Sequence, residues 1–106
     1  MIINQYEVNN ITDNRYLNEI YKEALFIDIE TTGLSRKYSD IISITLLLYE
    51  NEKYKIYQIF CQYKIDQPSA LKDLRDFIKS KKYVITYNGN SFDIPFLAEK
   101  AEQNNI

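Results

Sequence analysis

The spacing of hydrophobic and polar positions along this chain predicts a mixed α/β fold. Residues 24–29 form a short, apolar and partly β-branched run, which favours a buried strand that ends at the turn 31–33. Two longer β-rich runs, 41–49 and 54–63, are separated by four polar residues that suit a hairpin connection. These three segments predict an antiparallel meander.

Three further segments have helical spacing of apolar residues. The pattern predicts helices over 13–22, from Pro68 to about 80–82, and over 92–103. Residues 83–87 lie between the last two helices and predict a fourth strand, which we expect to lie parallel to the first. The opening ten residues are polar and mixed and predict no regular element. The expected order is α, β, β, β, α, β, α.

The length of 106 residues suits one compact core and is too short for two ordinary domains. We divide the chain into an N-terminal segment with a helix, 1–23, and a main domain, 24–106. The longest apolar stretches are far shorter than the roughly 20 residues that cross a bilayer, so we expect no membrane partner. Cys61 is the single cysteine, which excludes an internal disulfide and favours a reducing, cytoplasmic setting.

Charge and composition exclude two classes of site. Thirteen basic and fifteen acidic side chains give a net charge of −2, so the chain lacks the overall positive charge of a non-specific nucleic-acid binder. The sequence has no histidine and no pair of cysteines, which excludes a zinc site of the usual kind. A nucleic-acid partner would therefore need local basic groups or bridging metal ions.

Two carboxylates interrupt the apolar strand 24–29 and its continuation. Asp28 and Glu30 are two positions apart, so their side chains lie on one face of a strand, with attachment points about 6.6 Å apart. Asp93 follows the fourth strand, and a parallel arrangement would bring it to the same edge of the sheet. Carboxylates without histidine or cysteine favour Mg²⁺ or Mn²⁺, and two such ions could act together on a phosphodiester.

Two stretches of sequence carry a resemblance to a known family. Residues 26–34 read Phe-Ile-Asp-Ile-Glu-Thr-Thr-Gly-Leu, and residues 87–97 read Tyr-Asn-Gly-Asn-Ser-Phe-Asp-Ile-Pro-Phe-Leu. They resemble the first and second motifs of the DEDD 3′-to-5′ exonuclease superfamily, in its bacterial branch of ribonuclease H-like exonucleases. The resemblance covers the chain from about residue 24 to its end.

The resemblance implies a ribonuclease H-like α/β fold: a three-stranded antiparallel meander, a crossover helix, a parallel fourth strand and a helix with the second motif. It implies that Asp28, Glu30 and Asp93 are the catalytic metal ligands for two Mg²⁺ or Mn²⁺ ions. It also implies a metal-dependent 3′-to-5′ exonuclease acting on the 3′ ends of DNA or RNA. The positions that would contact this substrate are Thr31, Gly33, Leu34 and Asn88.

The third motif of the family is not found in this sequence. It supplies a fourth aspartate preceded by a Tyr or His that acts as general base, and the fifth strand and last helix are missing with it. We therefore expect a C-terminally truncated domain that is weak or inactive alone. The strand 83–87 would then have an open edge, through which a homodimer could form.

Other interpretations of these residues remain open. The whole chain could be a catalytically inactive nucleic-acid-binding or protein-interaction module with the same fold; a general α/β phosphoesterase ranks last because histidine is absent. Asp93 could be a helix N-terminal acid stabilised by the helix dipole. Leu34 could pack in the core or a turn, and the ten tyrosines are more typical of cross-strand packing than of base stacking. The basic residues at 79, 81 and 82 are typical of a solvated helix end.

Overall fold

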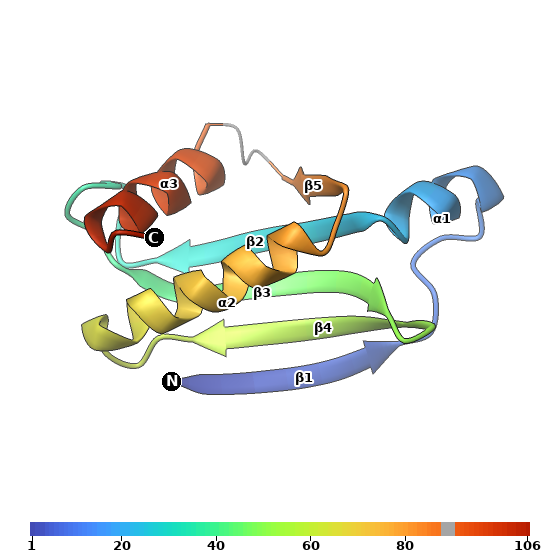
Figure 1. Cartoon of the computed structure of the whole chain (residues 1–106), viewed down its shortest axis with the longest axis horizontal. Coiled ribbons are helices and arrows are strands. Elements are labelled where there is room, and N and C mark those ends of the chain that lie inside the picture. Colours follow the sequence, from blue (N-terminus) through green and yellow to red (C-terminus); the bar gives the residue numbers. More distant parts are fainter. Residues whose placement is uncertain (88–90) are drawn as a thin grey trace.

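The computed structural model describes residues 1–87 and 91–106. Its strands form one five-stranded sheet in the order β1-β4-β3-β2-β5, with two helices on one face and a short helix at one end (Figure 1). The predicted α/β class is confirmed. The elements in chain order are β1 (Ile2–Val8), α1 (Arg15–Tyr21), β2 (Ala24–Thr31), β3 (Ile41–Glu50), β4 (Lys53–Phe60), the 3₁₀ turn η1 (Lys64–Asp66), α2 (Gln67–Lys79), β5 (Tyr83–Thr86) and α3 (Asp93–Gln103).

The predicted meander and the parallel strand are confirmed. β2 pairs antiparallel with β3, β3 pairs antiparallel with β4, and β5 pairs parallel with β2. The β3–β4 connection is tighter than the four polar residues suggested, because Glu50 and Lys53 already pair across the sheet. Asn51 and Glu52 form the turn with φ values of 52° and 66°, the left-handed conformation that two-residue hairpins require.

Strand β1 was not predicted from the sequence. It pairs antiparallel with β4 over its whole length, from Ile2 opposite Phe60 to Val8 opposite Tyr54. Most of its side chains are exposed, so no alternation of apolar and polar residues marks it. Backbone hydrogen bonds to the neighbouring strand, rather than burial, hold it in place. Residues 2–8 therefore extend the sheet of the main domain.

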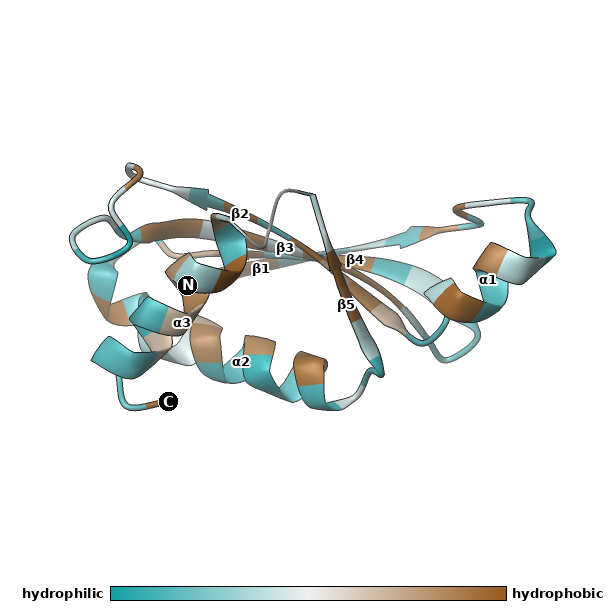
Figure 2. Ribbon diagram, turned by 90° about the horizontal axis from the view of Figure 1, so that it is seen from above, coloured by the Kyte–Doolittle hydropathy of each residue, from teal (hydrophilic) through white to brown (hydrophobic). Residues whose placement is uncertain are grey.

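The core lies between one face of the sheet and helices α2 and α3, which Figure 2 shows on the same side of the strands. Phe96, Leu25, Ile44, Leu46, Leu48 and Ile59 are the largest fully buried side chains. On the other face no described helix covers the middle of the sheet, and α1 packs only at one end, where Tyr21 meets Phe26 edge to face. No helix among the described residues is both long and apolar enough to cross a membrane.

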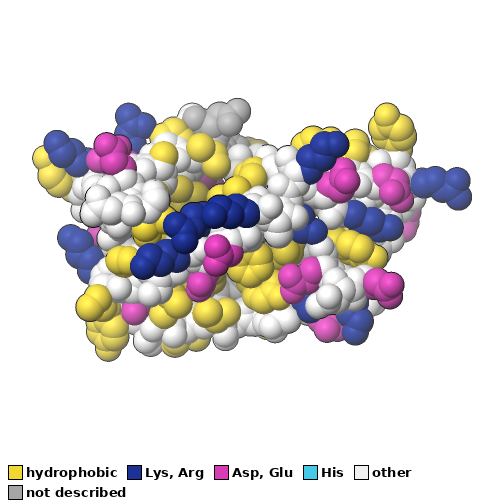
Figure 3. Space-filling view, in the orientation of Figure 1, with side chains coloured by type: hydrophobic (Ala, Val, Ile, Leu, Met, Phe, Trp, Pro, Cys, Tyr) yellow, Lys and Arg dark blue, Asp and Glu magenta, His cyan; other side chains and the backbone are white. Residues whose placement is uncertain are grey.

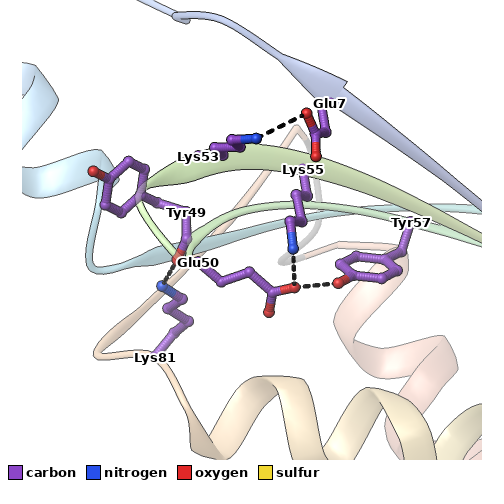
Figure 4. Close-up of polar contacts among 7 residues, drawn as sticks. All are labelled: Glu7, Tyr49, Glu50, Lys53, Lys55, Tyr57 and Lys81. Atoms are coloured by element: carbon purple, nitrogen blue, oxygen red, sulfur yellow. Dashed lines mark hydrogen bonds and ion pairs between the residues drawn. The ribbon is translucent and has the colours of Figure 1, made fainter.

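Polar contacts fix the start of β5 beside β2, and Figure 4 shows one of them, between Lys81 and the Tyr49 carbonyl. Lys81 was expected at a solvated helix end, but its ammonium is partly buried and donates to the backbone carbonyls of Lys22, at 3.0 Å, and Tyr49. The backbone N–H groups of Lys82 and Tyr83 both donate to the carbonyl of Glu23. These bonds hold the start of β5 against the start of β2, where Ala24 pairs with Tyr83.

Strand β5 lies at the edge of the sheet, as expected, with β2 as its one neighbour. Tyr83 and Val84 are each 41% exposed there. The outer backbone edge of β5 has no pairing strand among the described residues. The homodimer expected through this edge stays a prediction.

Candidate functional site

Asp28 and Glu30 lie on the open face of the sheet. In β2 the residues Leu25, Ile27 and Ile29 are buried beneath the helices, while the two acids between and beyond them are exposed. The alternation of a strand therefore places both carboxylates on one face, as the sequence indicated. Asp28 borders a trough of about 480 Å³ whose walls are mainly apolar side chains of β2, β3 and β5.

Asp93 is the first residue of α3 and is only 6% exposed. The pairing of β5 with β2 ends where Ile27 meets Thr86, and β2 continues past that point to Thr31. The backbone N–H of Ile29 is therefore free on this side and donates to the Asp93 carboxylate. This bond ties the N-terminus of α3 to the middle of β2.

The Asp93 carboxylate is in an unfavourable environment. Its Oδ2 atom is buried and has no hydrogen-bond partner among the described residues. Burial raises the pKa of Asp93, the negative charge of Asp28 raises it further, and the hydrogen bond from Ile29 opposes the shift. The structure thus brings Asp93 and Asp28 close enough to repel each other.

Glu30 does not join them in a compact group. Within residues 1–87 and 91–106, no three Asp, Glu, His or Cys side chains gather closely enough to hold a metal ion. The assignment of all three acids as metal ligands stays a prediction. Asn88, the fourth expected substrate contact, lies outside the described residues.

The segment from the last residue of β2 to the start of β3, residues 31–40, forms a closed loop. Its ends are joined twice, because the Thr32 N–H donates to the Asp40 carbonyl and the Asp40 N–H donates to Thr32 Oγ1, each at 2.9 Å. Thr31 Oγ1 donates to the Gly33 carbonyl at 2.7 Å. Leu34 projects from this loop and is 88% exposed, so the alternative that it packs in the core is wrong. Its contact with substrate stays a prediction.

Gly33 is required for space rather than for an unusual backbone angle. A Cβ built on this residue would lie 2.8 Å from Ser39 Oγ, closer than such atoms approach, and 3.8 Å from Ser39 Cβ, an ordinary contact. The glycine therefore lets the two sides of the loop approach each other. The loop geometry gives Gly33 a structural role, and its contact with substrate stays a prediction.

We expect Gly33→Ala to destabilise the protein by about 1 kcal/mol or more, because the new methyl group is overpacked against the Ser39 hydroxyl. Ser39→Ala should remove this penalty, since the remaining Cβ contact is normal. In the double variant, Gly33→Ala should be neutral or slightly stabilising, as alanine restricts the unfolded chain. Urea denaturation of the four proteins measures this coupling, and strictly additive effects would contradict it.

Four residues that shape this region were not identified as functional from the sequence. Gln67 is buried, accepts from the Ile41 N–H at 3.0 Å and donates to Asp40 Oδ1 at 3.0 Å, so it holds the end of the loop. Gln103 on α3 donates to the Lys37 carbonyl at 3.0 Å. No local sequence signal marks either glutamine. The adjacent cations Arg36 and Lys37 follow the first motif after one residue, and that position is the signal by which they could have been found.

A groove of about 430 Å³ separates this loop from the N-terminus of α3. Its lining residues on the loop side are Leu34, Ser35, Arg36 and Lys37, and on the other side Ser91, Phe92, Pro95 and Phe96. Asp93 itself is buried and does not line the groove, but it stands between Phe92 and Pro95 in the chain, so the groove runs close to the carboxylate site.

Two comparisons with known proteins bear on this site. Residues 25–106 match the RNase H superfamily. The chain is also similar to the DNA polymerase III PolC-type of Mycoplasma genitalium, with 28% identity over 113 aligned positions that cover 84% of this chain and 8% of that protein. The chain thus spans less than a tenth of the length of this relative.

Proposed function

This chain belongs to the RNase H superfamily, and from that membership we propose that it is a metal-dependent nuclease that acts on nucleic-acid phosphodiesters. More specifically, we propose that it removes nucleotides from the 3′ ends of DNA or RNA in the cytoplasm. The similarity to a protein named as a DNA polymerase supports a nucleic-acid substrate.

The observation that carries this proposal is the buried Oδ2 of Asp93. An ionised oxygen that no donor of the described residues reaches, close to the charge of Asp28, is destabilising unless something positive lies against it. A hard divalent cation fits this donor set, which contains carboxylate oxygens and no histidine. Asp28 and Asp93 would hold the ion, and Glu30, on the same face as Asp28, would approach from β2.

When bound, such a cation supplies Lewis acidity for phosphodiester hydrolysis. The residues of the chain then have separate tasks. The Ile29 N–H orients the Asp93 carboxylate, and the rigid strand β2 fixes Asp28 and Glu30 relative to it. The loop 31–40 and the first turn of α3 form the groove in which the end of a strand would lie. Leu34 would contact the terminal nucleotide.

A catalytically inactive nucleic-acid-binding or interaction module is the second candidate. It is favoured by the absence, in the part of the chain that the structure describes, of any group of three metal-binding side chains. Two carboxylates alone would bind a cation weakly and leave the second ion of a two-metal mechanism without ligands.

Calorimetric titration with Mn²⁺ and a hydrolysis assay on single-stranded DNA and RNA test the proposal. We expect saturable Mn²⁺ binding and slow, Mn²⁺-dependent release of nucleotides from 3′ ends. Asp28→Asn should abolish both. The matched control is Asp13→Asn, because Asp13 is an exposed aspartate that precedes α1, and this variant should behave as the wild type.

Equal heats for the wild type and Asp28→Asn would overturn the metal site. Saturable binding without hydrolysis would favour the inactive module instead.

A further inference from the structure

The loop 31–40 presents two cations and an aromatic ring to solvent. Arg36 and Lys37 are exposed, and Tyr38 is 78% exposed. The Lys37 ammonium lies 5.6 Å from the centre of the Tyr38 ring. In the described residues neither cation lies within ion-pair distance of a carboxylate. In a chain of net charge −2, this is a local concentration of positive charge beside an acidic site.

The loop is held in a fixed conformation. Inside it, the Ser39 N–H donates to the Ser35 carbonyl at 2.7 Å, and the Tyr38 N–H donates to Ser35 Oγ at 3.2 Å. From outside, Gln103 on α3 donates to the Lys37 carbonyl and Gln67 holds Asp40. A surface that is ordered before binding loses less conformational entropy when a ligand arrives. The exposed side chains are therefore carried on a backbone that is already ordered before a ligand binds.

The position of the loop relates it to the carboxylates. It lies beside α3 (Figure 1), and Arg36 and Lys37 line the groove whose opposite wall is formed by Phe92 and Pro95 on either side of Asp93. A strand whose end reaches Asp93 through this groove would continue past the two cations.

We propose that Arg36, Lys37 and Tyr38 form a platform for single-stranded nucleic acid, which binds the nucleotides upstream of the 3′ end without sequence preference. This inference rests on the proposed function for the location of that end. The cations would contact phosphates and the tyrosine ring would stack on a base, the combination by which single strands are bound. A base can stack on Tyr38 only when it is not stacked between neighbouring bases, so a duplex is a poorer ligand than a single strand.

The probe is fluorescein-labelled (dT)₁₅, with (U)₁₅ as the RNA arm and a blunt hairpin duplex as the third ligand. Fluorescence anisotropy in EDTA measures binding without hydrolysis, over a series of salt concentrations. We expect the wild type to bind both single strands more tightly than the hairpin. A difference in affinity between (dT)₁₅ and (U)₁₅ would show whether the surface prefers DNA or RNA.

The two halves of the platform should respond differently to salt. Arg36→Ala/Lys37→Ala should weaken binding at least tenfold at low salt. It should also flatten the dependence of log Kd on log salt by about 1.4, the value for two lost contacts with single-strand phosphates. Tyr38→Ala should weaken binding at least about fivefold with an unchanged salt slope, and Tyr38→Trp should restore it.

Matched controls use a second basic surface. Figure 3 shows Lys and Arg side chains over α2, where Arg75 and Lys79 are exposed. Arg75→Ala/Lys79→Ala removes the same charge from the chain and should change the affinity less than twofold. Tyr16→Ala removes a tyrosine that is 80% exposed on α1 and should leave binding unchanged.

Three results would overturn the platform: no measurable binding by the wild type, an equal or greater loss in the α2 variant, or tighter binding of the hairpin. Failure of the proposed function has a different signature. In that case Asp28→Asn and the wild type would show the same response to Mn²⁺, while the binding losses of the loop variants in EDTA would persist.

Discussion

Asp93→Asn is expected to raise the free energy of unfolding in EDTA and, at the same time, to abolish Mn²⁺ binding and Mn²⁺-dependent hydrolysis. The wild-type carboxylate is buried, one of its oxygens has no hydrogen-bond donor within residues 1–87 and 91–106, and the charge of Asp28 is close by. An uncharged amide of the same shape removes the repulsion and the cost of burying a charge, while its oxygen can still accept from Ile29. We expect a gain of about 1–2 kcal/mol, or a rise in Tm of roughly 4–8 °C for each kcal/mol.

Thermal unfolding with and without Mn²⁺ provides the sharpest test. In EDTA the variant should melt at a higher temperature than the wild type. Saturating Mn²⁺ should stabilise the wild type by mass action and leave the variant unchanged, which narrows or reverses the difference. Asp13→Asn should shift neither curve. A variant that melts below the wild type in EDTA would show that the ionised carboxylate stabilises the fold, and the cation-site interpretation of Asp93 would lose its basis.

Phe96→Ala is expected to bring the protein close to the limit of its stability. Phe96 is fully buried, its ring centre lies 5.5 Å from that of Phe92, and the Lys100 ammonium lies 5.6 Å from the ring. Truncation of a buried phenylalanine typically costs about 3–5 kcal/mol, against a total of about 5–15 kcal/mol for a domain. Because α3 carries Asp93, the cation site should weaken together with the fold.

Urea denaturation followed by circular dichroism measures this loss. The control is Ile94→Ala on the same helix, where the side chain is 39% exposed and the cost should stay below about 1 kcal/mol. A similar midpoint for both variants would mean that α3 contributes little to the core. Comparison of the two m-values shows whether α3 has already detached in Phe96→Ala before denaturant is added. In that case unfolding would expose less additional surface, and the m-value would be lower.

The sequence predicted the sheet well where burial leaves a pattern and failed where it does not. The strands with an apolar face or an apolar run, β2 to β5, follow from periodicity, whereas β1 is held by backbone bonds to β4 and carries mostly exposed side chains. The length of the hairpin turn was also missed, because two residues with positive φ, Asn51 and Glu52, replace the glycine that usually marks such a turn.

The candidate site, too, could be predicted from the sequence only in part. The common face of Asp28 and Glu30 follows from strand alternation alone. The burial of Asp93 could not be predicted, because it depends on β5 ending before β2 does and leaving the Ile29 N–H free. The contacts of Gln67 and Gln103 with the loop join residues that are far apart in sequence, and no local pattern predicts them.

The parallel pairing of β5 with β2 determines when the site can form during folding. β2, β3 and β4 are joined by hairpin-like antiparallel contacts between successive segments, which close early because the intervening loops are short. The contact between Ala24 and Tyr83 must wait until more than half of the chain has been brought back across the sheet. Asp28 belongs to β2 and Asp93 follows β5, so the two acids can meet only after this late contact has formed. A chain that has folded only its meander therefore carries an incomplete carboxylate pair, and the proposed cation site would form only after α3 has docked.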